Sequence, residues 1–141
     1  MKHNDITFLR ITYLRGPNLW TYRSVLEAWV DIGDLEDYPS NKLDGFTERL
    51  TAWLPGLHAH RCSVGTTGGF VQRLHEGTWP AHILEHVTIE LQNLVGMQTG
   101  FGKAREAGPR GIYKVAIRAR EESVGRAALE LGRELLMAAI N

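Results

Sequence analysis

The sequence predicts an α+β domain, with a small antiparallel sheet and helices packed on one face of it. Two observations predict this fold class. Segments rich in β-branched and aromatic residues, partly alternating with polar ones, occur near the start of the chain and again over residues 112–119. Segments with apolar residues three and four positions apart lie between and after them. Each kind of element therefore has an apolar face to bury against the other.

Three stretches carry the strand pattern. "ITFLRITYL", Ile6 to Leu14, is expected to form a strand that ends at the turn "RGPN". A second strand fits "SVLEAWVDI", although a short helix through Leu26 fits the same residues. The segment "TGFGKAREAGPRGIYKVAIRA" predicts a hairpin, in which "GPRG" is the turn and "IYKVAIRA" is the returning strand.

Between these stretches the chain alternates loops and helices. "DIGDLEDYPSN" is expected to be a loop because of its glycine, proline and aspartate content. "GFTERLTAWLPG" places Phe46, Leu50 and Trp53 at helical spacing and should stop at Pro55. The glycine-rich "CSVGTTGGF" then leads into a short helix, "FVQRLHEG".

Two longer helices complete the prediction. Thr78 is expected to cap a helix over about residues 79–95, which ends near Gly96. The C-terminal segment "EESVGRAALELGRELLMAAI" is amphipathic and has acidic residues in its first turn, as the helix dipole prefers.

Length and composition indicate one domain, residues 1–141, with its own core. Sixteen basic and sixteen acidic residues disfavour nucleic-acid binding through bulk charge. The single cysteine, Cys62, excludes an internal disulfide and is expected to be buried and inert. Charges at Lys2, Asp5 and Arg10 interrupt any signal-peptide core, and no apolar run approaches the ~20 residues of a membrane span. We therefore expect a cytoplasmic protein with no membrane partner.

The long helix carries the candidate site. On a helical wheel, His82, His86 and Glu90 line up along one edge of the apolar stripe, where a cleft against a neighbouring element would lie. Histidines four residues apart project together and can share one zinc ion. Glu85 lies about 60° from His82. Residues 82–86, His-Ile-Leu-Glu-His, have the HxxEH order of the inverzincin metallopeptidases. In such a site a carboxylate takes a proton from zinc-activated water.

Zinc needs a third ligand, for which Glu90 on the same helix and Glu122 at the start of the last helix are the candidates. The alternative is structural. The two histidines would then be edge residues bonded to backbone or water, and Glu85 and Glu90 would be ordinary helix formers. His58 and His60, two residues apart, are expected to point apart and to make a poor zinc pair.

Three long motifs resemble a known family. "RGPNLW", "CSVGTTGGFVQRLHEGTWPAHILEHVTIELQNLVGM" and "FGKARE" are similar, in this order, to the N-terminal domain of cyanophycin synthetases. The resemblance implies a domain that engages cyanophycin, a poly-aspartate chain with arginine on each side-chain carboxylate. For some members it also implies a zinc-dependent hydrolase that cuts the polymer internally, so that the shorter chains prime synthesis. His82, Glu85 and His86 match that site, and Glu90 matches an acidic position of the family.

The synthetases continue into an ATP-grasp domain and a Mur-ligase-like domain, which these residues do not contain. No GxxxxGK[ST] loop occurs either, so we expect no nucleotide site and no ligation by this chain alone. It is either an excised domain or a free-standing relative. The partners considered are cyanophycin, the ligase domains of a full-length synthetase and further copies of the chain.

Charged residues outside the motif are candidates for substrate binding. Asp34 and Asp37 would pair with the polymer's guanidinium groups, or they simply form a solvated acidic turn. Arg73 and Arg105 would bind carboxylates, or they form ordinary surface ion pairs. Two functions follow from the sequence: a zinc-dependent endo-hydrolase of cyanophycin with Glu85 as general base, and a non-catalytic module that tethers the polymer for separate ligase sites.

Overall fold

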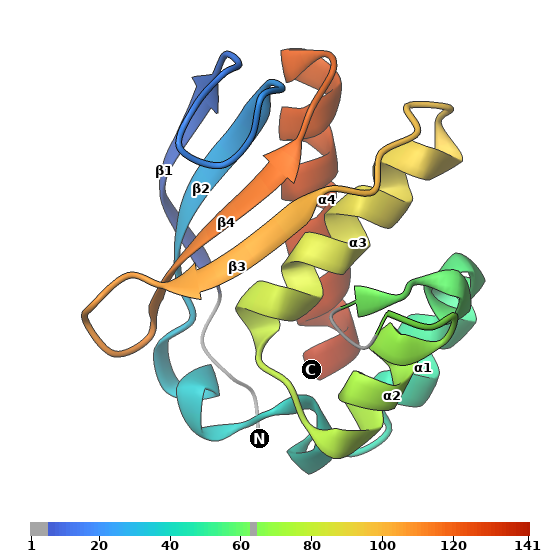
Figure 1. Cartoon of the computed structure of the whole chain (residues 1–141). Helices are drawn as coiled ribbons and strands as arrows, with labels where there is room; N and C mark the ends of the chain where they lie inside the picture. The colour runs from blue at the N-terminus through green and yellow to red at the C-terminus, as the bar shows by residue number, and fades with distance from the viewer. Residues whose placement is uncertain (1–5, 63–64) are drawn as a thin grey trace.

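A four-stranded antiparallel sheet forms one side of the molecule (Figure 1). The structure, a computed structural model, describes residues 6–62 and 65–141, so Lys2, Asp5 and part of the glycine-rich connection lie outside the described residues. The strand order is β1-β2-β4-β3, and every neighbouring pair is antiparallel. The strands are β1 (Thr7–Leu14), β2 (Val25–Asp31), β3 (Gly102–Glu106) and β4 (Ile112–Arg118). The strand predictions are confirmed, and residues 25–31 form a strand rather than a short helix.

The two faces of the sheet differ in character. In the central strand β2, Leu26, Ala28 and Val30 are fully buried on the core face. The intervening Trp29 lies on the other face, where Arg10 and Lys114 sit 5.1 Å and 4.8 Å from the centre of its ring. Alternation along the strand therefore separates an apolar face from a face of aromatic and basic side chains.

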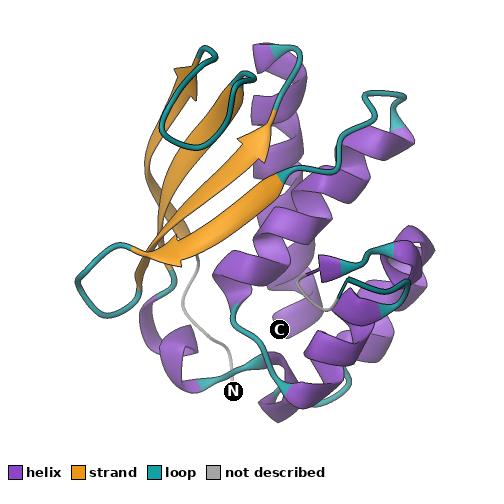
Figure 2. Cartoon of the chain, in the orientation of Figure 1, coloured by secondary structure: helices purple, strands orange, loops and turns teal. Residues whose placement is uncertain are grey.

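Helices cover the apolar face (Figure 2). They are α1 (Phe46–Trp53), α2 (Gly69–Glu76), α3 (Pro80–Leu94) and α4 (Glu122–Ile140). The two longest, α3 and α4, lie side by side against the sheet, while α1 and α2 lie beside them at the lower right of the view. The predicted α+β class, with a small antiparallel sheet and helices packed on it, is confirmed.

The segment expected to be a plain loop contains two short 3₁₀ helices, η1 (Gly33–Asp37) and η2 (Ser40–Lys42). Leu35 is fully buried in the core, and its N–H donates to the carbonyl of Ile32 at 3.1 Å. The prediction from polar composition missed this apolar anchor, which holds the segment against the domain. A third 3₁₀ helix, η3 (Pro55–Ala59), follows α1.

Thr78 does not cap α3, contrary to the prediction. The residue at the N-cap position is Trp79, which makes no side-chain capping bond, and Pro80 occupies the first turn. Proline is tolerated there because the N–H that it lacks has no partner within the helix. The Thr78 hydroxyl lies instead 2.9 Å from Nδ1 of His82.

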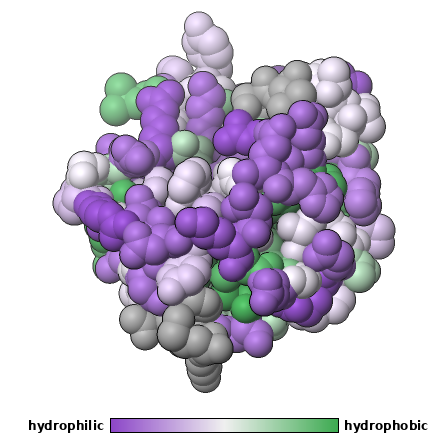
Figure 3. Space-filling model, turned by 90° about the horizontal axis from the view of Figure 1, so that it is seen from below, coloured by the Kyte–Doolittle hydropathy of each residue, from purple (hydrophilic) through white to green (hydrophobic). Residues whose placement is uncertain are grey.

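The surface seen from below in Figure 3 is mostly hydrophilic, with a small hydrophobic patch. In the part of the chain that the structure describes, none of the helices combines the length and the apolar character that crossing a membrane requires.

The helices α3 and α4 approach closely at Gly132. A Cβ added there would lie 3.2 Å from the Thr88 hydroxyl and 3.4 Å from methyl groups of Leu84 and Val87. The absence of a side chain therefore sets the distance between the two helices.

Replacing Gly132 by leucine is expected to lower the free energy of unfolding by about 1–3 kcal/mol, because the added side chain must displace this close-packed interface. Ala138→Leu, on the exposed side of α4, is the matched control and should change the free energy of unfolding by less than about 0.5 kcal/mol. Urea denaturation followed by circular dichroism measures both. Equal stability of the two variants would show that α3 and α4 do not pack this closely.

Candidate metal centre

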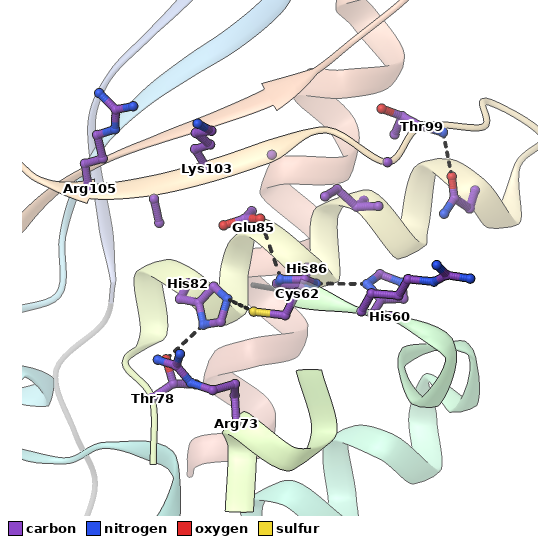
Figure 4. A pocket seen from close by; sticks show the side chains of 16 residues that line it. His60, Cys62, Arg73, Thr78, His82, Glu85, His86, Thr99, Lys103 and Arg105 are labelled. Carbon is purple, nitrogen blue, oxygen red and sulfur yellow. Dashed lines mark hydrogen bonds and ion pairs between the residues drawn. The ribbon is translucent and has the colours of Figure 1, made fainter. Parts of the chain in front are cut away.

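The polar edge of α3 faces a cavity of about 820 Å³ (Figure 4). His82, Glu85 and His86 line it from α3, and Cys62 lines it from the segment before α2. The opposite wall is β3 with the segment that leads into it, including Thr99, Gly102, Lys103 and Arg105, and Arg73 of α2 also lines the cavity. The cleft expected beside the apolar stripe is therefore present, and all three residues of the HxxEH pattern face it.

Three side chains of the types that can bind a metal ion converge in this cavity. The ligand atoms of Cys62, His82 and His86 all lie within 4.8 Å of one another. The closest pair is Cys62 Sγ and His82 Nε2, at 3.1 Å. Cys62 is half-buried rather than buried, and its φ of 56° is unusual for a residue with a side chain. Such a backbone conformation often marks a functional position, and the expectation of a buried cysteine was wrong.

Aromatic packing fixes the two histidine rings. Phe70 of α2 stacks on His86, with ring centres 4.0 Å apart and an angle of 16° between the planes. The same phenyl ring meets His82 edge to face, with centres 5.6 Å apart. His60, at the end of η3, lies beside His86 on the other side, with the Nδ1 atoms of the two rings 3.0 Å apart. The orientation of the two α3 histidines is thus set by residues from other elements.

Burial lowers the pKa of both histidines. The pKa of His82 falls to about 4, through burial and then the nearby charge of Arg73. The pKa of His86 falls to about 2, through burial and then through His82 and His60. At neutral pH both rings are therefore uncharged, which is the form that binds a metal ion.

Glu85 is packed closely in the same cavity. A Cβ on Gly102 of β3 would lie 2.7 Å from Glu85 Cγ, so the glycine allows the strand to approach this side chain. Burial raises the pKa of Glu85 to about 7, and the charge of Lys103 opposes the rise. Its Oε2 lies 3.6 Å from His86 Nε2. Because His86 is neutral, this contact is not an ion pair between two full charges.

The other predicted site residues lie in different places. Glu90 hydrogen-bonds His60, with Oε1 and Nε2 3.0 Å apart, and is not in the group of converging donors. Glu122 pairs with Arg126 at 2.8 Å on the exposed start of α4. Arg73 and Arg105 line the cavity.

The acidic residues of η1 lie away from these walls. Neither Asp34 nor Asp37 is among the described residues that line the cavity. Asp37 pairs with Arg110 of the β3–β4 turn. The structure therefore places Arg73 and Arg105 at the cavity wall, and it places Asp34 and Asp37 outside the cavity.

Sequence reasoning missed three contributors to the centre: His60, Cys62 and Phe70. His60 and Cys62 are separated from His82 by about twenty residues, so no helical periodicity connects them. The sequence nevertheless held one signal for Cys62. This single cysteine begins the same long motif that contains the HxxEH pattern, and His60 precedes it by two residues.

Together, the fold and the cavity define an α+β domain with a candidate site for one metal ion, built from thiol, imidazole and carboxylate groups. Comparison with known proteins identifies its family. The model of the cyanophycin synthase-like N-terminal domain matches residues 27–141, and the chain belongs to this family.

Similar relatives include cyanophycin synthetases of Trichormus variabilis and a Nostoc species, each 47% identical over 122 residues. These matches cover 85% of this chain and 14% of each relative. The cyanophycin synthetase of a Synechocystis species is 46% identical over 134 residues, which are 91% of this chain and 15% of the relative. The chain therefore spans about one seventh of the length of these relatives.

The raised pKa of Glu85 predicts a pH-dependent stability of the metal-free protein. Because the folded-state pKa of about 7 exceeds the ordinary value of 4.5, the protonated carboxyl stabilises the fold at low pH, and this contribution is lost as the pH rises through 7. In Glu85→Gln, the glutamine side chain carries no charge at any pH of the experiment. The variant's free energy of unfolding, relative to the parent, should therefore rise by on the order of 2 kcal/mol from about pH 5 to about pH 8.

Urea denaturation in the presence of a chelator measures this difference. The two histidines are present in both proteins, so their own titration largely cancels in the comparison. A difference that does not change with pH would mean that Glu85 is not held in an environment that disfavours its charge.

Proposed function

We propose that this domain binds one zinc ion through Cys62, His82 and His86 and hydrolyses cyanophycin internally, with Glu85 as the general base. The observation that carries the proposal is the convergence of these three donors, within 4.8 Å of one another, at the wall of a cavity that Glu85 also lines.

The donor set suits zinc. Thiolate and imidazole are the ligands that zinc prefers, and catalytic zinc sites use three protein ligands and leave one position for water or substrate. Cys62 in this role replaces Glu90 and Glu122, the third ligands considered from the sequence. When bound, zinc acts as a Lewis acid that polarises a carbonyl group and lowers the pKa of water.

Glu85 is placed to move the proton. In hydrolysis, the oxygen of water bonds to the carbonyl carbon of the substrate amide and the C–N bond breaks. The carboxylate of Glu85 takes the proton that water loses and delivers it to the leaving nitrogen, which becomes an amine. The side chain is mostly buried and held by the approach of β3, so it keeps its position between the two transfers.

The charges around the cavity suit a polymer that carries carboxylates and guanidinium groups. Arg73, Lys103 and Arg105 lie at its wall and would pair with carboxylates of cyanophycin. The guanidinium of Arg105 lies 4.9 Å from the centre of the Trp20 ring, which limits its movement. Asp34 and Asp37 would bind guanidinium groups of a chain that extends past the cavity. In a longer synthetase, the shortened chains would prime synthesis by the ligase domains.

The zinc-loaded domain is expected to shorten purified cyanophycin and to release new amine ends. Glu85→Gln should lower the rate at least a hundredfold, because the proton acceptor is lost while the three donors remain. His82→Ala and Cys62→Ala should lose bound zinc as well as activity. Gel analysis of polymer length, an amine assay and metal analysis of the dialysed proteins measure these effects.

His58→Ala, an exposed histidine of η3, is the control and should match the parent in metal content and in cleavage. Undiminished cleavage by Glu85→Gln would contradict the mechanism. Co-sedimentation of polymer with parent and variants alike, with no shortening by any of them, would instead support the non-catalytic tethering module.

A further inference from the structure

A chain of three polar side chains begins at the cavity wall with His86 and His60 and ends at Glu90. His60 Nδ1 lies 3.0 Å from His86 Nδ1, and His60 Nε2 lies 3.0 Å from Glu90 Oε1. The exposed fractions of the side chains are 9% for Glu90, 11% for His60 and 7% for His86. His60 and His86 line the cavity and Glu90 lies behind them, so each of the three mostly buried groups has a polar partner in the next one.

The order of donors and acceptors follows from Glu90. A carboxylate accepts hydrogen bonds and cannot donate them, so the contact with Glu90 assigns the proton of a neutral His60 ring to Nε2. In a neutral imidazole the other nitrogen is then an acceptor, and His60 Nδ1 accepts a hydrogen bond from Nδ1–H of His86. The neutral His86 ring consequently has its lone pair on Nε2.

This Nε2 faces the cavity. It lies 3.6 Å from Oε2 of Glu85, which lines the cavity, while the Nδ1 side of the ring is occupied by His60 (Figure 4). His82 is arranged in the same way, with Nδ1 at the Thr78 hydroxyl and Nε2 at Cys62. Each α3 histidine thus has a polar partner on Nδ1, while its Nε2 lies near Cys62 in His82 and near Glu85 in His86.

We propose that Glu90 and His60 are positioning residues, which fix His86 as its Nδ1–H tautomer and so present the Nε2 lone pair to a metal ion. This inference rests on the proposed metal site and adds a role for two residues that do not bind the metal. Partners of this kind orient ligating histidines and raise their basicity, and their loss commonly lowers metal affinity by 10- to 100-fold.

The backbone holds the carboxylate end of this chain in place. A Cβ on Gly56 of η3 would overlap the Glu90 carboxylate, since it would lie 2.6 Å from Cδ and closer still to Oε2. The glycine therefore lets η3 close over Glu90, while Phe70 holds the plane of His86. With both ends fixed, His60 has little freedom to reverse its two hydrogen bonds.

The direct test is the tautomer of His86 in the metal-free parent protein. Long-range ¹H–¹⁵N correlation spectra recorded with a chelator at about pH 8, above the ordinary imidazole pKa of about 6.5, distinguish protonated from unprotonated ring nitrogens. The proposal predicts a protonated Nδ1 on His86 and a protonated Nε2 on His60. A His86 ring protonated on Nε2 would overturn it. No variant is required, so a folding defect cannot obscure the result.

Zinc affinity provides the second measurement. His60→Leu, which removes both hydrogen bonds, should weaken zinc binding by about 10- to 100-fold. His60→Gln, whose amide keeps one donor and one acceptor, should lose less, and His58→Ala should match the parent. Gly56→Ala leaves every polar residue unchanged but displaces Glu90, and should also weaken binding.

The outcomes separate this inference from the proposed function. A parent protein that binds no zinc would contradict the metal centre itself. A parent that binds zinc, together with a His60→Leu variant that is folded by circular dichroism and has equal affinity, would contradict the positioning role alone.

Discussion

The burial of helix α3 is the constraint on which the rest of the structure depends. Eleven of its fifteen residues are buried, because the helix packs against β3 and β4 on one side and against α4 on another. Close approach at Gly132 fixes the distance between the helices, and the apolar stripe fixes the rotation of α3 about its own axis. The edge that carries His82, Glu85 and His86 therefore faces the cavity.

The same burial determines the protonation of the site. Removal of water disfavours the charged forms of three side chains: it lowers the pKa of His82 and His86 and raises that of Glu85. The histidines are thereby kept in the neutral form that binds metal. Without a cation, the cavity holds Glu85 at an energetic cost, which a bound metal ion would offset.

Much of the fold could be predicted from the sequence, because local periodicity determines it. The alternation in "IYKVAIRA" and the helical spacing in residues 80–94 correspond to β4 and α3. The composition of "DIGDLED" was misleading, since its two apolar residues, Ile32 and Leu35, are fully buried and hold the segment against the core. Of the candidate metal centre, only His82, Glu85 and His86 could be predicted, because they lie on one helix and share its periodicity. Cys62 and His60 join it through the packing of η3 against α3 and of Phe70 against the α3 histidines, and no short-range pattern in the sequence encodes these contacts.

Family membership gives the cavity its biochemical setting, and the proposed zinc centre is the central claim. X-ray absorption at the zinc edge, on the protein loaded with one equivalent of zinc, tests it most directly. One sulfur at about 2.3 Å and two imidazole nitrogens at about 2.0–2.1 Å are expected, with the remaining position filled by oxygen. A spectrum without sulfur, unchanged in Cys62→Ala, would contradict the assignment of Cys62, His82 and His86 as the metal ligands.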